Sequence, residues 1–217
     1  MRRSSAEDQQ RLRQQVLDAS FEIFRHKGLH GLTMRAVAAA VGVSAMALYR
    51  YFADKAELVQ GLWDYMMQDV HRDMSRAVAA EPTPRGRLRA CTDAAMAYWE
   101  GHPDQFRLVF MTEQTTAPRR ASQLADLPSY HRVIDLSLQI IDARAAELGA
   151  DPSRCLLARD LRMALMVGYL HARIVNRRYP WQDPDALRTR VIDTIVDAID
   201  DCLTSPPAAR TALRVAG

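Results

Sequence analysis

The sequence of 217 residues is poor in the features that mark several large classes of protein. Its three cysteines, Cys91, Cys155 and Cys202, are odd in number and widely spaced, which fits neither a disulfide framework nor a zinc site. We therefore expect buried thiols in a reducing cytoplasm. No apolar run approaches the roughly 18–20 residues that span a bilayer. The first ten residues lack the apolar segment of a signal peptide, so the sequence predicts a cytoplasmic protein.

Motifs for catalysis and metal binding are also missing. The histidines are dispersed without HExxH spacing, and the sequence has no glycine-rich phosphate loop and no nucleophile elbow. Asp135, Asp142 and Glu147 have the spacing of solvated helix faces rather than that of an acid–base pair. We expect no catalytic residue, no metal ligand and no cofactor.

The charge of the chain is unevenly distributed. Residues 1–55 hold nine Lys or Arg against five acids, an excess of four, whereas the remaining residues hold 20 basic and 21 acidic groups. Only two of the basic residues are lysines, Lys27 and Lys55. A basic head on a neutral body is typical of a nucleic-acid-binding module joined to a part with another function. Random surface charge would also produce such an excess fairly often.

Apolar residues recur at helical spacing along most of the chain, and no segment has convincing strand alternation. With hydrophobic residues at 48%, the sequence predicts a globular all-α protein. Weak periodicity over 112–127 predicts a surface loop. The predicted helices span about 10–25, 55–80, 84–101, 105–111, 129–148, 152–178 and 184–203, in addition to two short ones within the segment Gly31–Lys55.

The segment Gly31–Lys55 is the most informative part of the chain. Thr33 can cap a first short helix, Gly42 can supply a left-handed turn, and Ser44 can cap a second short helix. Ala40 is expected to face inward. This pattern is typical of a helix-turn-helix, whose second helix enters the DNA major groove.

The same segment resembles the DNA-binding head of the tetracycline-repressor (TetR) family over about residues 10–65. The residues that carry the resemblance are Gly28, Gly31-Leu32-Thr33, Val37-Ala38, Val41-Gly42-Val43-Ser44, Leu48-Tyr49-Arg50-Tyr51-Phe52, Lys55 and Glu57-Leu58. The resemblance implies an N-terminal three-helix DNA-binding head, residues 1–55, followed by a helical effector-binding and dimerisation domain, residues 56–217.

It also implies roles for single residues. Backbone phosphates would be contacted by Thr33, Tyr49, Tyr51 and Lys55. Bases would be read from Ser44, Ala45, Met46 and Ala47, with Arg35 and Arg50 assisting from the flanks. Because Ala45-Met46-Ala47 offers no side-chain hydrogen bond, readout would use thymine methyls, an arginine or DNA shape. The alternative is that the two tyrosines simply close the core of the head.

The body adds two expectations, each with the alternative that its residues belong to the core of the protomer. The last two predicted helices carry apolar faces that suit a dimer interface, formed by Leu161, Leu165, Gly168, Tyr169, Ala172, Val191, Ile192, Ile195, Val196 and Ile199. By resemblance, a small-molecule pocket would be lined by Tyr65, Met66, Met96, Trp99, Phe106, Phe110, Tyr130, Met163 and Met166.

These observations together predict a homodimeric transcriptional regulator. The family resemblance favours a repressor that binds a palindromic double-stranded DNA operator and is released by a small-molecule effector. Two alternatives stay open: a DNA-bound activator or ligand-independent regulator, and an all-α small-molecule-binding protein or enzyme whose head has lost DNA binding.

Overall fold

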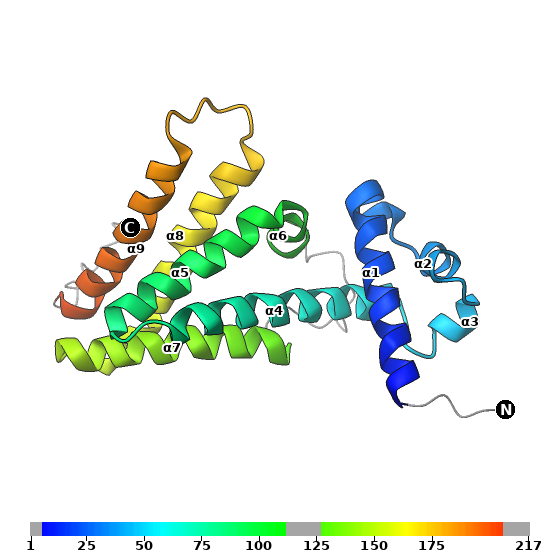
Figure 1. Cartoon of the computed structure of the whole chain (residues 1–217), viewed down its shortest axis with the longest axis horizontal. Helices are drawn as coiled ribbons and strands as arrows, with labels where there is room; N and C mark the ends of the chain where they lie inside the picture. The colour runs from blue at the N-terminus through cyan, green and yellow to red at the C-terminus, as the bar shows by residue number, and fades with distance from the viewer. Residues whose placement is uncertain (1–5, 112–126, 206–217) are drawn as a thin grey trace, which may run out of the picture. The chain divides into compact units, whose positions relative to one another are not determined.

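The computed structural model describes residues 6–111 and 127–205, and within these ranges the regular structure is helical (Figure 1). The predicted all-α class is therefore confirmed. The elements are α1 (Ala6–Gly31), α2 (Met34–Val41), α3 (Ala45–Leu48), α4 (Lys55–Ala79), α5 (Pro84–Gly101), α6 (Pro103–Phe110), α7 (Pro128–Leu148), the 3-10 turn η3 (Pro152–Arg154), α8 (Cys155–Val175) and α9 (Pro184–Thr204).

Side-chain caps fix where the helices begin. The backbone N–H of Glu57 donates to Asp54 Oδ1 at 2.8 Å, and Glu57 Oε2 accepts from the backbone N–H of Ala53 at 2.6 Å. The first bond caps α4, and the second holds the N–H of Ala53, one residue before the cap, rather than that of Asp54 as in a standard capping box. At α9, Asp183 Oδ1 accepts from the backbone N–H of Ala186 at 2.9 Å. Both predicted helix starts are confirmed.

Two predicted helices differ from the structure in their bounds. The first helix begins at Ala6 rather than near Gln10 and continues to Gly31, although Gly28 interrupts it with a left-handed φ of 64°. The helix predicted over 152–178 is divided, because Asp151 caps a 3-10 turn before α8 begins. The predicted loop 112–127 lies outside the described residues except for Leu127, which is buried.

The chain divides into two compact units, which we describe separately. The first unit comprises Met1–Asp73 with Tyr98–Asp135, and the second comprises Met74–Ala97 with Leu136–Gly217. The first unit contains the predicted head. The predicted boundary between head and body at residue 55 coincides with the start of α4 and stays a prediction.

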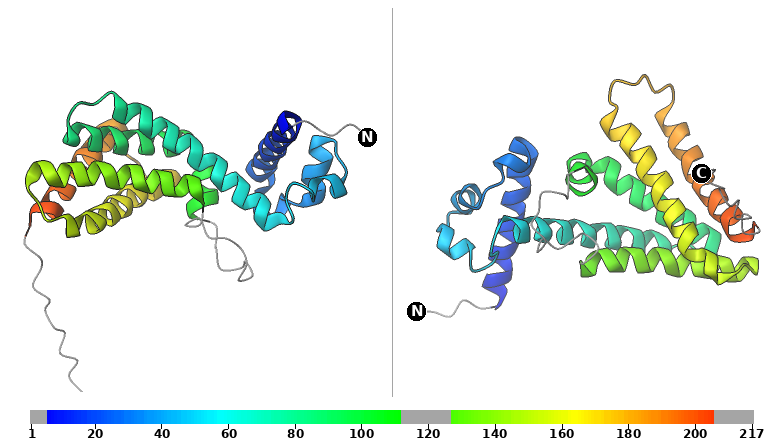
Figure 2. Two further views of the ribbon diagram at one scale, coloured as in Figure 1. Left: turned by 90° about the horizontal axis from the view of Figure 1, so that it is seen from below. Right: turned by 180° about the vertical axis from the view of Figure 1, so that it is seen from behind.

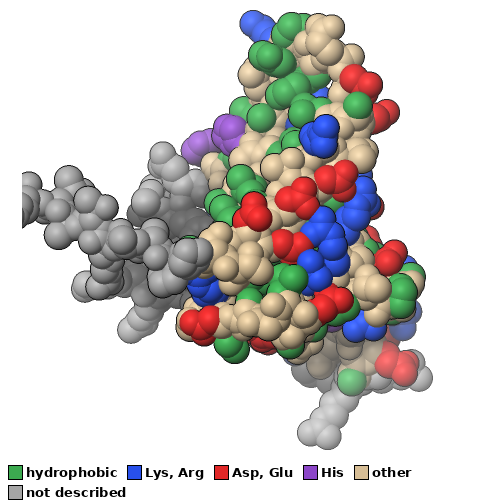
Figure 3. Space-filling view, turned by 90° about the vertical axis from the view of Figure 1, so that its left-hand side faces the viewer, with side chains coloured by type: hydrophobic (Ala, Val, Ile, Leu, Met, Phe, Trp, Pro, Cys, Tyr) green, Lys and Arg blue, Asp and Glu red, His purple; other side chains and the backbone are tan. Residues whose placement is uncertain are grey.

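In the second unit α8 and α9 run side by side, as Figures 1 and 2 show. Arginines join α9 to α5: Arg89 Nε lies 3.0 Å from Asp193 Oδ1, and Arg188 Nη1 lies 2.5 Å from Asp93 Oδ1. Acidic and basic side chains lie close together on the face that Figure 3 presents. Exposed pairs of this kind contribute little stability each but restrict how the helices can pair.

The cysteines are free thiols, with Cys91 and Cys155 buried and Cys202 half-buried. Burial and a hydrogen bond with Asp142 raise the pKa of Cys155 to about 11, as expected for a packing residue rather than a reactive one. None of the helices in the described ranges combines the length and the hydropathy needed to cross a bilayer.

Candidate nucleic-acid interface

The turn between α2 and α3 has the predicted geometry. Gly42 adopts a left-handed φ of 76°, a conformation that costs other residues free energy. It ends α2, and the backbone N–H of Val43 then donates to Ala38 O at 3.0 Å. Ser44 Oγ accepts from the backbone N–H of Ala47 at 3.1 Å and so caps α3. Three residues, 42–44, are enough to join the two helices.

The core of the head holds this turn in place. Leu32, Val37, Leu48 and Phe52 have no exposed surface. Arg13 lies over the ring of Phe52, with its guanidinium carbon 4.5 Å from the ring centroid. The four-residue helix α3 is therefore anchored through Leu48 and the segment after it, while its other positions remain available to a partner.

One prediction about this core is wrong. Ala40 is exposed, and the inward positions of α2 are Met34, Val37 and Ala38. The buried stripe of α2 ends at Ala38, and Ala40 lies in the last turn, two residues before Gly42 ends the helix.

None of the ten predicted DNA-contact residues is buried. Met46 is 77% exposed and Tyr49 is 49% exposed, which are high values for such large side chains. The exposed members are Thr33, Arg35, Ser44, Met46, Tyr49 and Arg50, and the half-buried members are Ala45, Ala47, Tyr51 and Lys55. The structure thus leaves Tyr49 outside the core, which is the position a phosphate contact requires.

Lys55 has an internal partner that its sequence position did not indicate. Its ammonium donates to Leu29 O at 2.5 Å and thereby binds the start of α4 to the end of α1. Burial lowers the pKa of Lys55. An ammonium has three N–H groups, and this bond uses one of them. A phosphate contact by Lys55 stays a prediction.

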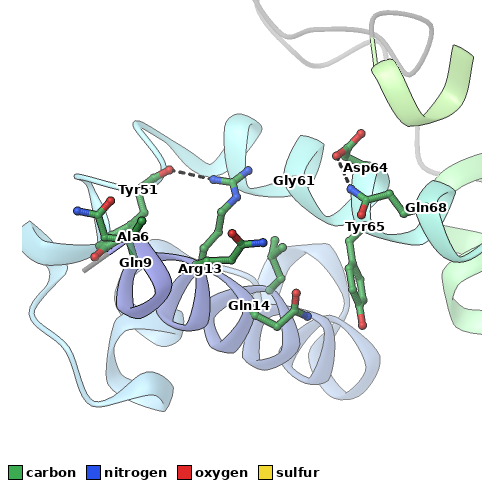
Figure 4. Close-up of a pocket in the computed structure, with 11 residues that line it drawn as sticks. Ala6, Gln9, Arg13, Gln14, Tyr51, Gly61, Asp64, Tyr65 and Gln68 are labelled. Atoms are coloured by element: carbon green, nitrogen blue, oxygen red, sulfur yellow. Dashed lines mark hydrogen bonds between the residues drawn. The ribbon is translucent and has the colours of Figure 1, made fainter. Parts of the chain in front are cut away.

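A polar cavity of about 380 Å³ lies between α1 and α4 in the first unit (Figure 4). Its lining includes Gln9, Gln14 and Gln68, and Arg13 Nη1 donates across it to Tyr51 O at 3.4 Å. Tyr65 is the one predicted pocket residue on its wall. This cavity is therefore a different site from the predicted apolar effector pocket.

The other predicted pocket residues lie in both units. Met66, Met96, Trp99, Phe106 and Met166 are buried, and Tyr65, Phe110, Tyr130 and Met163 are half-buried. In the first unit the rings of Trp99 and Phe110 have centroids 5.2 Å apart, and those of Phe106 and Phe110 are 4.9 Å apart. Such contacts suit a packed core as well as a pocket wall.

The residues predicted for the dimer interface separate into two groups. Tyr169 on α8 and Ile192, Ile195, Val196 and Ile199 on α9 are buried within the described chain. Leu161, Leu165, Gly168, Ala172 and Val191 are exposed or half-buried. Leu157 and Val175, which the prediction omitted, extend the exposed α8 group by a turn at each end. We call Leu157, Leu161, Leu165, Gly168, Ala172 and Val175 the α8 stripe.

Arg162 is a further residue that sequence reasoning missed. It is 5% exposed and lies on the inward face of α8, between Ala158 and Met166 at four-residue spacing. The sequence did contain a signal for this residue, because Arg162 is an arginine on an otherwise apolar face of a predicted helix.

In the described residues, no group of three or more potential metal ligands was found.

A capped helix-turn-helix with an exposed second helix is the arrangement by which many transcriptional regulators bind DNA. Residues 16–62 match the profile of the family described as bacterial regulatory proteins, tetR family. The head of the chain therefore matches the TetR family, as the resemblance predicted.

The chain is 30% identical over 112 residues to the HTH-type transcriptional activator FasR of Mycolicibacterium smegmatis, covering 52% of this chain and 51% of FasR. It is 36% identical over 89 residues to the HTH-type transcriptional repressor DrrR1 of Streptomyces coeruleorubidus, covering 41% of this chain and 32% of DrrR1. It thus spans about half or less of the length of these relatives. A putative transcriptional regulator from Pseudomonas aeruginosa PAO1 has the same fold, with a TM-score of 0.73 at 21% identity, covering 91% of this chain and 93% of that one.

Proposed function

We propose that this regulator is a repressor that binds a palindromic operator as a homodimer and is released by a small-molecule effector. The observation that carries the DNA-binding part is the surface of α3, where Met46 and Tyr49 are exposed while Leu48 anchors the helix. A hydroxyl-bearing tyrosine suits a phosphate oxygen, and a thioether suits a thymine methyl.

The proposed dimer follows from the length of α3. A helix of four residues covers too few base pairs for useful affinity, and two-fold dimers place two heads in successive major grooves about 34–36 Å apart. The α8 stripe supports this proposal, because Leu157 and Leu165 are 64% and 37% exposed. Apolar side chains at this spacing on one helix face can pack against the same helix of a second protomer.

The proposed release uses the contact between α4 and α1. Because Lys55 binds Leu29 O, a tilt of the first turn of α4 would move the end of α1 with it. An effector that binds the body in only one position of α4 would then lower DNA affinity through its differential affinity for the two states.

DNA binding is tested by selecting sites from random DNA with the full chain and measuring salt-dependent affinity. We expect a palindromic site, and we expect Tyr49→Ala to weaken binding at least tenfold. Tyr179→Ala is the matched control, since Tyr179 lies outside the head and is 54% exposed against 49% for Tyr49. Sequence-independent binding, or equal affinity of the two variants, would contradict the proposal.

A second candidate is an activator, which the similarity to FasR favours. The two functions differ in the sign of their effect on a promoter that contains the selected site. A reporter measured with and without the regulator separates them: expression rises on deletion of a repressor and falls on deletion of an activator.

A further inference from the structure

Arg162 on α8 is a buried cation that two other helices of the second unit, α5 and α7, hold by hydrogen bonds. Its Nε donates to Thr92 Oγ1 on α5 at 3.0 Å, and its Nη1 donates to Ser137 Oγ on α7 at 3.3 Å. Its Nη2 donates to Cys91 O at 3.2 Å and lies 3.6 Å from Cys91 Sγ. Each of these acceptors is neutral.

Its neighbours among the arginines are different. Arg89 and Arg188 pair with carboxylates of Asp193 and Asp93, and Arg144 pairs with Asp200 at 2.8 Å. Within residues 6–111 and 127–205, no carboxylate lies within 4.0 Å of Arg162, although Arg162 is more deeply buried than any of these. The least exposed guanidinium of this group is therefore the one without an anionic partner.

A guanidinium does not lose its proton in a protein, so Arg162 carries its charge in this interior. Buried apolar residues lie one turn from Arg162 on α8, at Ala158 and Met166. Others lie one turn from its partners on α5, at Leu88 and Ala95. Burying an ion without a counter-ion is costly, and folding has already removed the water from this one. An anion that reaches it gains a charge-assisted pair without a second desolvation of the cation.

The orientation of the side chain indicates which edge an anion would use. Thr92 Oγ1 donates to Leu88 O at 2.9 Å and accepts from Nε, which fixes the inner side of the guanidinium. The Nη1–Nη2 edge makes longer contacts than Nε does, at 3.3 Å to Ser137 Oγ, 3.2 Å to Cys91 O and 3.6 Å to Cys91 Sγ. This edge matches the two oxygens of a carboxylate, which accept parallel N–H bonds.

We propose that Arg162 binds the carboxylate of the effector, and that the effector is a small organic acid with an apolar remainder. This inference rests on the proposed function, because it assumes that the body binds an effector. The apolar neighbours of Arg162 select the remainder of the molecule, and the guanidinium selects its charge.

The test compares acids with their uncharged amides on the full chain. The thermal unfolding midpoint is measured at pH 7.5 with butyrate, octanoate, decanoate, benzoate and phenylacetate, and with the primary amide of each. We expect at least one acid to raise the midpoint by 2 °C or more while its amide does not, because binding to the folded state alone stabilises it. If no acid raises the midpoint above its amide, the inference is overturned.

Two variants assign the effect to one side chain. Arg162→Met should abolish the difference between acid and amide, whereas Arg159→Met, the same change on the same helix at a less buried position, should retain it. If Arg162→Met does not fold, Arg162→Lys replaces it in the test, because lysine keeps the charge. The loss of the planar guanidinium should weaken acid binding at least tenfold. If either Arg162 variant binds the acid with the affinity of the wild type, the inference is overturned.

Operator affinity measured in parallel separates this inference from the proposed function. Arg162→Met should bind the operator as the wild type does and should no longer be released by the stabilising acid. Acid binding that leaves operator affinity unchanged in the wild type would overturn the effector role of the site. Failure of the wild type to bind any specific DNA would overturn the proposed regulator while the acid–amide difference stands.

Discussion

Gly168→Arg is the sharpest test of the proposed dimer, because the change is harmless within one protomer. Gly168 is exposed in the middle of the α8 stripe, and a Cβ built on it meets nothing within 4 Å. Replacing glycine inside a helix should raise helix stability by about 0.8 kcal/mol. Any loss of assembly would therefore report on the partner's helix and not on strain in the protomer.

The expected magnitude follows from the exposure of the stripe. Leu157, Leu165 and Val175 are 64%, 37% and 40% exposed. At about 2 kcal/mol for each fully buried side chain, covering them contributes roughly 3 kcal/mol per protomer. Association costs about 4–15 kcal/mol, so the interface has little margin. A desolvated, unpaired arginine from each protomer costs several kcal/mol more, and the dimer dissociation constant should rise at least about 1,000-fold.

Sedimentation equilibrium from nanomolar to micromolar concentration measures this constant, and circular dichroism checks that the variant is folded. Ala146→Arg, on an exposed position of α7 outside the stripe, is the matched control and should assemble as the wild type does. Operator affinity should fall with dimerisation in Gly168→Arg only. A folded Gly168→Arg protein with the wild-type dissociation constant would refute the assignment of the stripe to the dimer interface.

Three further predictions concern local features. Ser44→Ala should lower the free energy of unfolding by about 1 kcal/mol, because the backbone N–H of Ala47 loses its cap; denaturant melts that match the wild type would contradict this. Gly42→Ala should cost about 1–2 kcal/mol in the same melts, since alanine must adopt the left-handed φ of 76°, and an unchanged midpoint would show that the turn can relax. Burial and the nearby charge of Arg132 lower the pKa of His71, so the unfolded state binds the proton more readily and stability should fall as pH decreases below about 6.5. In denaturant melts between pH 7 and 5, the free energy of unfolding of His71→Gln should decrease less than that of the wild type. An equal decrease would show that His71 is not its cause.

Local chemistry made much of the fold predictable. Thr33 and Ser44 cap the helices as predicted, and Asp54 and Asp183 cap α4 and α9 where the sequence predicted these helices to begin, because a cap needs only a short side chain and the next three residues. Glycine was equally informative at Gly42, where the turn requires a positive φ.

Contacts between distant segments were not predictable from one sequence. Lys55 and Leu29 are 26 positions apart, and Asp64 accepts hydrogen bonds from Ser129, 65 positions away. Arg162 belongs to the same class, since its partners lie on two other helices. Periodicity identified the apolar face of α9 but could not say that Ile192 and Ile199 are covered within the chain and not by a second copy.

The anchoring of α3 through Leu48 and the segment after it has a consequence for how the proposed operator preference can change. Ala45, Met46 and Ala47 contribute no fully buried side chain, and the cap that Ser44 Oγ provides bonds only the backbone N–H of Ala47. If these three positions read bases as proposed, substitutions there should alter base preference with little effect on folding. The proposed recognition is therefore open to retargeting, by natural drift or by design, independently of the rest of the molecule.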